Sequence, residues 1–201
     1  MILALSLAIG LAAACTSATS NTPAPNNTTA ANKAAVNTGA PANVAPKAED
    51  ETPALVKAAF PDAQSFTKQH KDISKEQIAS IEKETKAKLP DTDHHSYVAF
   101  STAGGARKQI GAATIVKANG KDILIIYDNK DGRPFVKEIR AEGISSDFLK
   151  QFAGKNHDDK FLIGGDLKAN GVDDTTAKAI AEAVRVDAMT MQTLYGAPDK
   201  H

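Results

Sequence analysis

The sequence predicts an α+β fold, with an antiparallel sheet meander, helices packed against it and a long C-terminal helix. Four stretches alternate apolar and polar residues with a period of two, as strands do. They are Ser96–Ser101, Lys108–Ala118, Asp122–Asp128 and Pro134–Arg140. The turns between them are short, and links of this length join antiparallel neighbours. Helical patterns stand before and after the strands, which favours helices gathered against one sheet.

Turn residues separate the four predicted strands. The turns contain Gly104-Gly105, Asn119-Gly120 and the segment Asn129 to Gly132. An Asn-Gly pair is among the strongest hairpin signals because both residues tolerate a positive φ.

Two helices are predicted ahead of the strands. Ala54 to Phe60 forms a short helical turn that Pro61 stops. Ser74 to Gln77 is a capping box, with Ser at the cap and Gln three residues later. The helix behind this box buries Ile78 and Ile81 and ends before Pro90.

After the strands, the chain predicts a short helix and a brief strand. Ser145, Ser146 and Asp147 supply cap oxygens for a helix with apolar residues at 148, 149 and 152, and Gly154 closes it. Phe161 to Ile163 is apolar and predicts a brief strand that leads into a glycine-bearing loop.

The loop 164–176 opens a long helix. Asp173, Asp174 and Thr175 all have cap chemistry, and Gly196 and Pro198 end the helix. Apolar residues recur every three or four positions along one face, at Ala177, Ile180, Ala181, Val184, Ala188, Met191 and Tyr195.

Two interpretations of this helix start remain open. It is an ordinary capped helix, or it is the phosphate end of a nucleotide cofactor site, because free N–H groups and the helix dipole favour an anion. The negative charges of Asp173 and Asp174 count against a phosphate there.

The composition excludes some partners and chemistries. The 201 residues suit one domain with a tail, and 24 Lys and Arg balance 24 Asp and Glu. We therefore expect no nucleic-acid partner. A single cysteine allows neither a disulfide framework nor a Cys-x-x-Cys-His haem attachment.

The N-terminus indicates export. Residues 1–14 are uncharged and apolar, too short to span a bilayer, which needs about 20 residues, but as long as the core of a signal peptide. Cys15, the only cysteine, follows directly. The pattern resembles a bacterial lipoprotein signal, although no Lys or Arg precedes the apolar core and Ala12 stands where Leu is usual. The resemblance implies that Cys15 is lipidated and anchors the chain on the extracytoplasmic side of a membrane. The alternative is a thiol buried in a core.

The segment 15–51 is therefore predicted to consist of a lipidated cysteine and a tether. Residues 16–51 are rich in Ala, Asn, Thr and Pro and carry almost no large apolar side chain, so they predict a flexible segment. A coil of this length reaches roughly 30 Å on average. The folded head is therefore predicted over residues 52–201.

The head combines the strand meander with the stretch Asp-Phe-Leu-Lys-Gln-Phe-Ala-Gly-Lys (Asp147 to Lys155), an Asp-led loop and a terminal Ala-Ile-x-x-Ala-Val helix. This combination, over roughly Lys108 to Tyr195, is similar to the FMN-binding domain. That domain occurs in periplasmic electron-transfer subunits of the Rnf and Nqr complexes and in the nitrous-oxide regulator NosR. The resemblance implies a periplasmic electron carrier with redox proteins as partners. We expect a carrier more than an enzyme with its own substrate, and no catalytic residue is predicted.

The flavin attachment motif of that family is altered here. In covalent members, an Asp-led loop carries Ser/Thr-Gly-Ala-Thr, whose last Thr bonds the FMN phosphate. Aligned without gaps, Asp166 matches the leading Asp, and the tetrapeptide becomes residues 171–174, Gly-Val-Asp-Asp. Asp174 thus takes the acceptor position without a hydroxyl.

The resemblance therefore implies non-covalent FMN, with Gly171, Asp174, Thr175 and Thr176 as the expected contacts. The alternative is a flavin-free binding or assembly module on the same scaffold.

Two histidine-containing stretches raise the question of a metal site. Asp93-His94-His95 and His157-Asp158-Asp159 could each begin one. Adjacent side chains in a strand point to opposite faces, however, and a metal needs further ligands that the sequence does not place. Both stretches are expected to be solvated loops, and no metal ligand is predicted.

Overall fold

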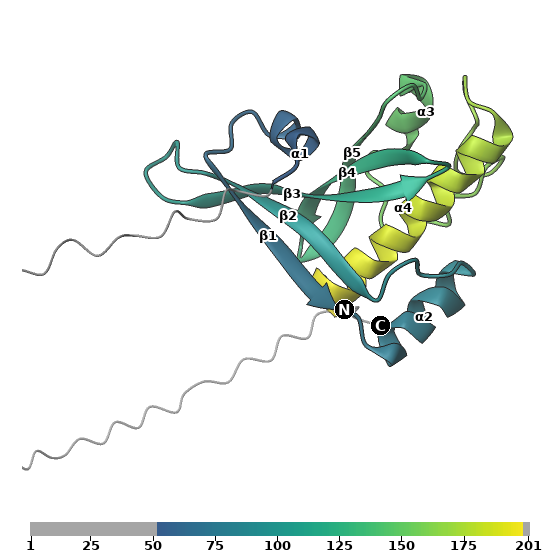
Figure 1. The fold of residues 1–201 in the computed structure, drawn as a ribbon, viewed down its shortest axis with the longest axis horizontal. Coiled ribbons are helices and arrows are strands. Elements are labelled where there is room, and N and C mark those ends of the chain that lie inside the picture. Colours follow the sequence, from purple (N-terminus) through teal and green to yellow (C-terminus); the bar gives the residue numbers. More distant parts are fainter. Residues whose placement is uncertain (1–51, 199–201) are drawn as a thin grey trace, which may run out of the picture. The chain divides into compact units, whose positions relative to one another are not determined.

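The computed structural model describes residues 52–198, so the predicted signal segment, Cys15 and the tether lie outside the described residues. Five strands and a long final helix dominate this part of the chain (Figure 1). In chain order the elements are α1 (Ala54–Ala59), β1 (Ser65–Asp72), α2 (Lys75–Thr85), β2 (Asp93–Ser101), β3 (Lys108–Ala118), β4 (Lys121–Lys130), β5 (Arg133–Ala141), α3 (Ser146–Leu149), the 3₁₀ turn η1 (Lys150–Phe152) and α4 (Asp174–Tyr195).

The strands form one antiparallel meander in the order β1-β2-β3-β4-β5, which confirms the predicted α+β class. Tight two-residue turns join β3 to β4 and β4 to β5. Asn119 and Gly120 have φ of 48° and 75°, and Asp131 and Gly132 have φ of 53° and 80°. Positive φ at both central residues is the signature of the hairpin turn that matches strand twist.

The sheet buries both of its faces along β4. Ile123, Ile125 and Tyr127 point into the core beneath α4, whereas Leu124 and Ile126 pack with α1 on the other face. All five residues are at most 2% exposed. Successive side chains of a strand alternate between faces, so an unbroken apolar run is what a strand covered on both sides needs.

Helix α4 carries an apolar stripe toward the sheet and a second contact toward α2. Ile180, Val184 and Met191 are buried in the core, as their spacing predicts. On the outer side, Val186 packs with Ile81 of α2. Arg185 also donates to the carbonyl oxygens of Glu84 and Thr85 at 2.9 and 3.1 Å, which binds the open end of α2 to α4.

Several local predictions hold. Ser74 accepts from the Gln77 N–H, and the Gln77 side chain accepts from the Ser74 N–H, so the capping box is present. Helix α4 ends at Tyr195 with Gly196 as its C-cap. Within residues 52–198, no helix has both the length and the apolar character needed to cross a membrane.

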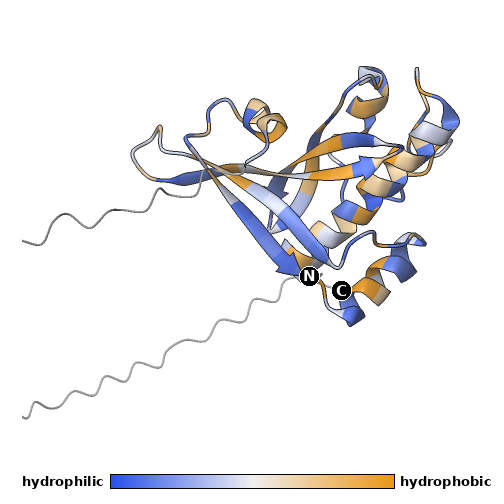
Figure 2. Ribbon diagram, in the orientation of Figure 1, coloured by the Kyte–Doolittle hydropathy of each residue, from blue (hydrophilic) through white to orange (hydrophobic). Residues whose placement is uncertain are grey.

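Other predictions are wrong. Strand β1 was not predicted, since its side chains are mostly exposed and polar, as its hydrophilic colour in Figure 2 shows. Phe161 to Ile163 is not a strand. Phe161 has a φ of 53°, and the segment makes only an isolated bridge between Ile163 and Leu167. Ser145 does stand at the N-cap of α3, but its side chain makes no cap hydrogen bond.

Of the two loops predicted around the histidines, one is wrong. His94 and His95 lie in β2 rather than in a solvated loop, and they point to opposite faces, with His94 buried and His95 exposed. His157 to Asp159 does form a turn with Asp158 exposed, but the His157 side chain is buried at 8% exposure.

Candidate functional site

The stretch Asp147–Lys155 is built into the core and bonded to β5. Phe148 and Phe152 are fully buried and meet edge to face, with ring centroids 5.3 Å apart. The Gly154 N–H donates to the Val136 carbonyl at 2.8 Å, and the Val136 N–H donates to the Lys155 carbonyl at 2.8 Å. The apolar and Gly-Lys parts of the motif therefore have structural roles.

Gln151 joins this stretch to the Asp-led loop. Its side-chain amide donates to the Lys168 carbonyl at 2.8 Å, and its side-chain oxygen accepts from the Lys168 N–H at 2.8 Å. This pair of hydrogen bonds has the donor and acceptor pattern of two paired strands, and it holds the loop against α3 and η1. Two segments that carry the family resemblance, 17 residues apart, are thus one structural unit.

The loop approaches α3 at a second point. Gly171 has a φ of 71°, and a Cβ added there would come within 3.0 Å of the Ser145 hydroxyl oxygen. A side chain at this position would be strained by its backbone conformation and crowded by Ser145. Gly171 is therefore explained by the close packing of the loop on the start of α3.

The N-terminus of α4 already holds a carboxylate. Asp173 is the N-cap, and its Oδ1 accepts from the Thr176 N–H at 2.9 Å. This backbone hydrogen bond, with a smaller contribution from the Thr176 side chain, lowers the pKa of Asp173. Because an anion occupies the positive end of the helix, a phosphate there would meet a like charge at short range.

The predicted contact residues differ in their surroundings. Thr176 is buried, and its hydroxyl accepts from the Asn119 side-chain amide at 2.7 Å, which fastens the helix start to the β3–β4 turn. Asp174 and Thr175 are exposed. Of the two threonines, Thr175 is thus the one whose side chain faces solvent.

A groove of about 390 Å³ lies between β5 and α3–η1, and we call it the β5–α3 groove. Apolar residues supply half of its lining, and three cationic residues are among the others. The lining residues are Lys137, Glu138, Ile139, Arg140, Ala141, Ile144, Ser146, Leu149, Lys150 and Ala153. Ser146 lines the groove, and its neighbour Ser145 lies where a side chain at position 171 would point, so the groove and the Asp-led loop are close to each other at the start of α3.

The cations of the groove are not equally available. Arg140 donates to Glu138 through two bonds, Nε to Oε1 at 2.7 Å and Nη2 to Oε2 at 3.2 Å, and its Nη1 donates to the Ala58 carbonyl of α1 at 3.2 Å, so its guanidinium is directed toward α1. The Arg140 side chain lowers the pKa of Glu138. Lys150 makes only a 3.5 Å contact with Asp147, and both side chains are about three-quarters exposed. Exposed pairs of this length contribute little, so the Lys150 ammonium can turn to another anion.

A buried polar cluster lies beneath α4. Asp187 is 4% exposed, and its Oδ2 accepts from Thr114 at 2.6 Å and from Tyr127 at 2.7 Å. Its Oδ1 lies 3.1 Å from His94 Nε2. Burial, and next the charge of Asp187, raise the pKa of Tyr127 well above its usual value, which keeps this phenol protonated as a donor.

Sequence reasoning missed this cluster, although one signal was present. Asp187 follows Val184 by three positions and therefore falls on the apolar stripe of α4. An acid on such a stripe needs buried donors. Its partners come from three different strands, and the sequence does not pair them.

A second cavity, of about 500 Å³, lies at the other end of α4. Met191 and Tyr195 form its helical side, and Gln69 and Ser96 are among the residues from the strands. The Tyr195 hydroxyl accepts from Ser96 at 3.3 Å. Because α4 has 22 residues and is about 33 Å long, this cavity is remote from the start of α4 and from the Asp-led loop.

Comparison of the chain with protein-family models, with curated proteins and with solved structures found no match.

Proposed function

We propose that this chain is an extracytoplasmic electron-transfer protein, anchored to the bacterial envelope through Cys15, that holds FMN non-covalently in the β5–α3 groove. Redox proteins would be its partners. The observation that carries the proposal is the Gln151 bond to Lys168, because it joins the two resemblance-bearing segments beside a groove of apolar and cationic side chains.

The chemistry of the groove suits a flavin without a covalent bond. Ile144, with the buried side chains of Ile139 and Leu149 behind it, forms the apolar wall that a planar ring would contact. Lys150 offers an ammonium for a phosphate. Bound FMN would supply the redox chemistry, and the protein would supply orientation and tuning.

In this proposal the Asp-led loop would contact the phosphate group of FMN. Gly171, Asp174, Thr175 and Thr176 remain the proposed loop contacts. The exposed Thr175 hydroxyl is the best donor among their side chains, whereas the charge of Asp174 opposes a phosphate. The lack of a hydroxyl at position 174 does not fit covalent attachment.

A fluorescence titration of the purified chain with FMN tests the proposal. We expect saturable quenching with one site, and Lys150→Glu should weaken binding about tenfold or more, since a lost charge–phosphate contact is worth about 1.5–3 kcal/mol. Lys83→Glu is the matched control, because Lys83 is exposed on α2 and lines neither cavity. Absence of quenching, or equal affinities of the two variants, would refute binding in the groove.

A second candidate is a flavin-free binding or assembly module at the same membrane. The specific observation in its favour is that Asp173 occupies the helix end where a phosphate would lie, with Asp174 next to it. The titration separates the two candidates, because this module would leave FMN fluorescence unchanged at every protein concentration.

A further inference from the structure

Two histidines and two aspartates share one face of the β1–β2 ladder. His70 stands directly opposite His95, and Asp72 stands directly opposite Asp93. Within each strand the histidine and the aspartate are two positions apart, so all four side chains leave the sheet on the same side. This is the face opposite to the one that His94 occupies.

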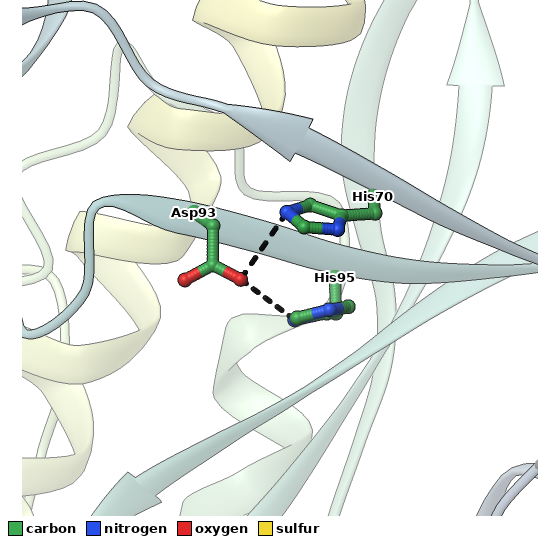
Figure 3. A group of neighbouring side chains, drawn as sticks. All are labelled: His70, Asp93 and His95. Carbon is green, nitrogen blue, oxygen red and sulfur yellow. Dashed lines mark ion pairs between the residues drawn. The ribbon is translucent and has the colours of Figure 1, made fainter.

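The side chains converge on one carboxylate oxygen. His70 Nε2 lies 3.4 Å from Asp93 Oδ2, and His95 Nδ1 lies 3.5 Å from the same oxygen (Figure 3). One ligand atom from each of these three residues lies within 4.8 Å of the other two. The imidazole centroids are 4.7 Å apart. We call these three residues the His70–His95 cluster.

These separations are long for hydrogen bonds but suit a shared ion. Nitrogen-to-oxygen hydrogen bonds cluster at about 2.7–3.2 Å. In a tetrahedral zinc site, bonds of about 2.0–2.2 Å place neighbouring ligand atoms about 3.3–3.6 Å apart. The two nitrogen-to-oxygen distances to Asp93, 3.4 and 3.5 Å, fall in that second range, and the two imidazole nitrogens lie within 4.8 Å of each other, so a small movement of the exposed rings would complete the geometry.

We propose that His70, Asp93 and His95 bind a divalent transition-metal ion of the zinc type. Imidazole nitrogens favour zinc and its neighbours in the first row, whereas a site of oxygens alone would favour calcium or magnesium. Asp72 Oδ1 lies 3.5 Å from His70 Nε2, but Asp72 does not belong to the group whose ligand atoms all lie within 4.8 Å of one another, so solvent would complete the coordination of the ion.

The exposure of the cluster indicates a site that loads from solvent. The side chains of His70 and His95 are 55% and 41% exposed, and that of Asp72 is 95% exposed. A structural zinc site is closed by four protein ligands, whereas this one is open on its outer side. We therefore infer reversible capture of the ion rather than a role in folding.

This site is independent of the proposed flavin function. It lies on β1 and β2, whereas the β5–α3 groove lies at β5, on the other edge of the sheet. Loss of metal binding would leave the FMN titration unchanged, and failure to bind FMN would leave this proposal intact.

Isothermal titration of the purified, metal-stripped full chain with Zn²⁺ tests the proposal. We expect one ion per chain. His70→Ala and His95→Ala should each weaken binding at least about tenfold, since even residues behind the ligands cost 10- to 100-fold when they are lost. Asp122→Asn is the control for a change at an exposed carboxylate outside the cluster, because Asp122 pairs with Lys117 beside the β3–β4 turn, and it should leave Zn²⁺ affinity unchanged.

The double variant His70→Ala/His95→Ala decides the outcome. Both side chains are exposed, so this variant should keep the circular dichroism spectrum and melting temperature of the parent chain. If the parent chain binds no Zn²⁺, or if the folded double variant binds Zn²⁺ with the parent's affinity, the three residues form only a surface ion-pair cluster and the proposal is wrong.

Discussion

Replacing Asp187 by Asn should destabilise the head strongly without changing the shape of the side chain. The carboxylate accepts from Thr114 and Tyr127 through one oxygen and contacts His94 through the other. An amide keeps only one acceptor oxygen and brings a new donor. Hydrogen bonds to charged groups contribute about 1.5–3 kcal/mol, against about 0.5–1.5 kcal/mol for neutral pairs.

The magnitude follows from those bonds. If the amide oxygen faces Thr114 and Tyr127, two bonds each weaken by about 1 kcal/mol, so we expect a loss of about 2 kcal/mol. Asp187→Ala removes every acceptor and leaves three buried polar partners unpaired, so its loss should reach about 4 kcal/mol or more.

Urea unfolding measures this difference. The midpoint should fall at an unchanged slope, since the same surface is exposed on unfolding. Glu182→Gln makes the same carboxylate-to-amide change on the exposed side of α4 and should stay within about 0.5 kcal/mol of the parent chain. If Asp187→Asn behaves like Glu182→Gln, the buried cluster does not stabilise the fold.

Two further predictions concern the Asp-led loop. Gln151→Ala removes both hydrogen bonds to Lys168, so the free energy of unfolding should fall by about 1–3 kcal/mol. The backbone amide of Lys168 should also exchange its hydrogen faster, which hydrogen-exchange mass spectrometry can follow. Unchanged exchange at Lys168 would contradict the role of Gln151. Asp173→Ala removes the N-cap of α4 and should lower the melting temperature at neutral pH. Because the hydrogen bond from the Thr176 N–H lowers the pKa of Asp173 in the folded state, its stabilisation is present above the unfolded pKa of about 3.9 and is lost as pH falls through the lower folded value. Melting curves of the parent chain and the variant should therefore converge in strong acid, and a gap independent of pH would contradict the cap.

The sequence predicted those elements whose local signals agree with their packing. β3 and β4 are rich in apolar residues and meet at an Asn-Gly turn, and α4 has both a cap and an apolar stripe. β1 failed because an exposed edge strand has no apolar period to detect. Phe161 failed because an aromatic side chain reached the core from a loop with a positive φ.

The candidate sites depend on contacts that no local pattern contains. The Gln151 bond to Lys168 spans 17 residues, and the motif gave no reason to assign it. His70 is 25 positions before His95, and the two meet only because β1 pairs with β2. Since β1 was not predicted, His70 could not be placed beside Asp93. The stretch Asp93 to His95 was therefore predicted to be a solvated loop.

The visible absorption spectrum of the chain extracted from its own membrane, taken before and after denaturing filtration, tests the central proposal most directly. The account predicts a yellow protein whose flavin colour passes entirely into the filtrate once the polypeptide unfolds. A colourless protein that stays colourless after incubation with FMN, or colour retained on the unfolded chain, would contradict it.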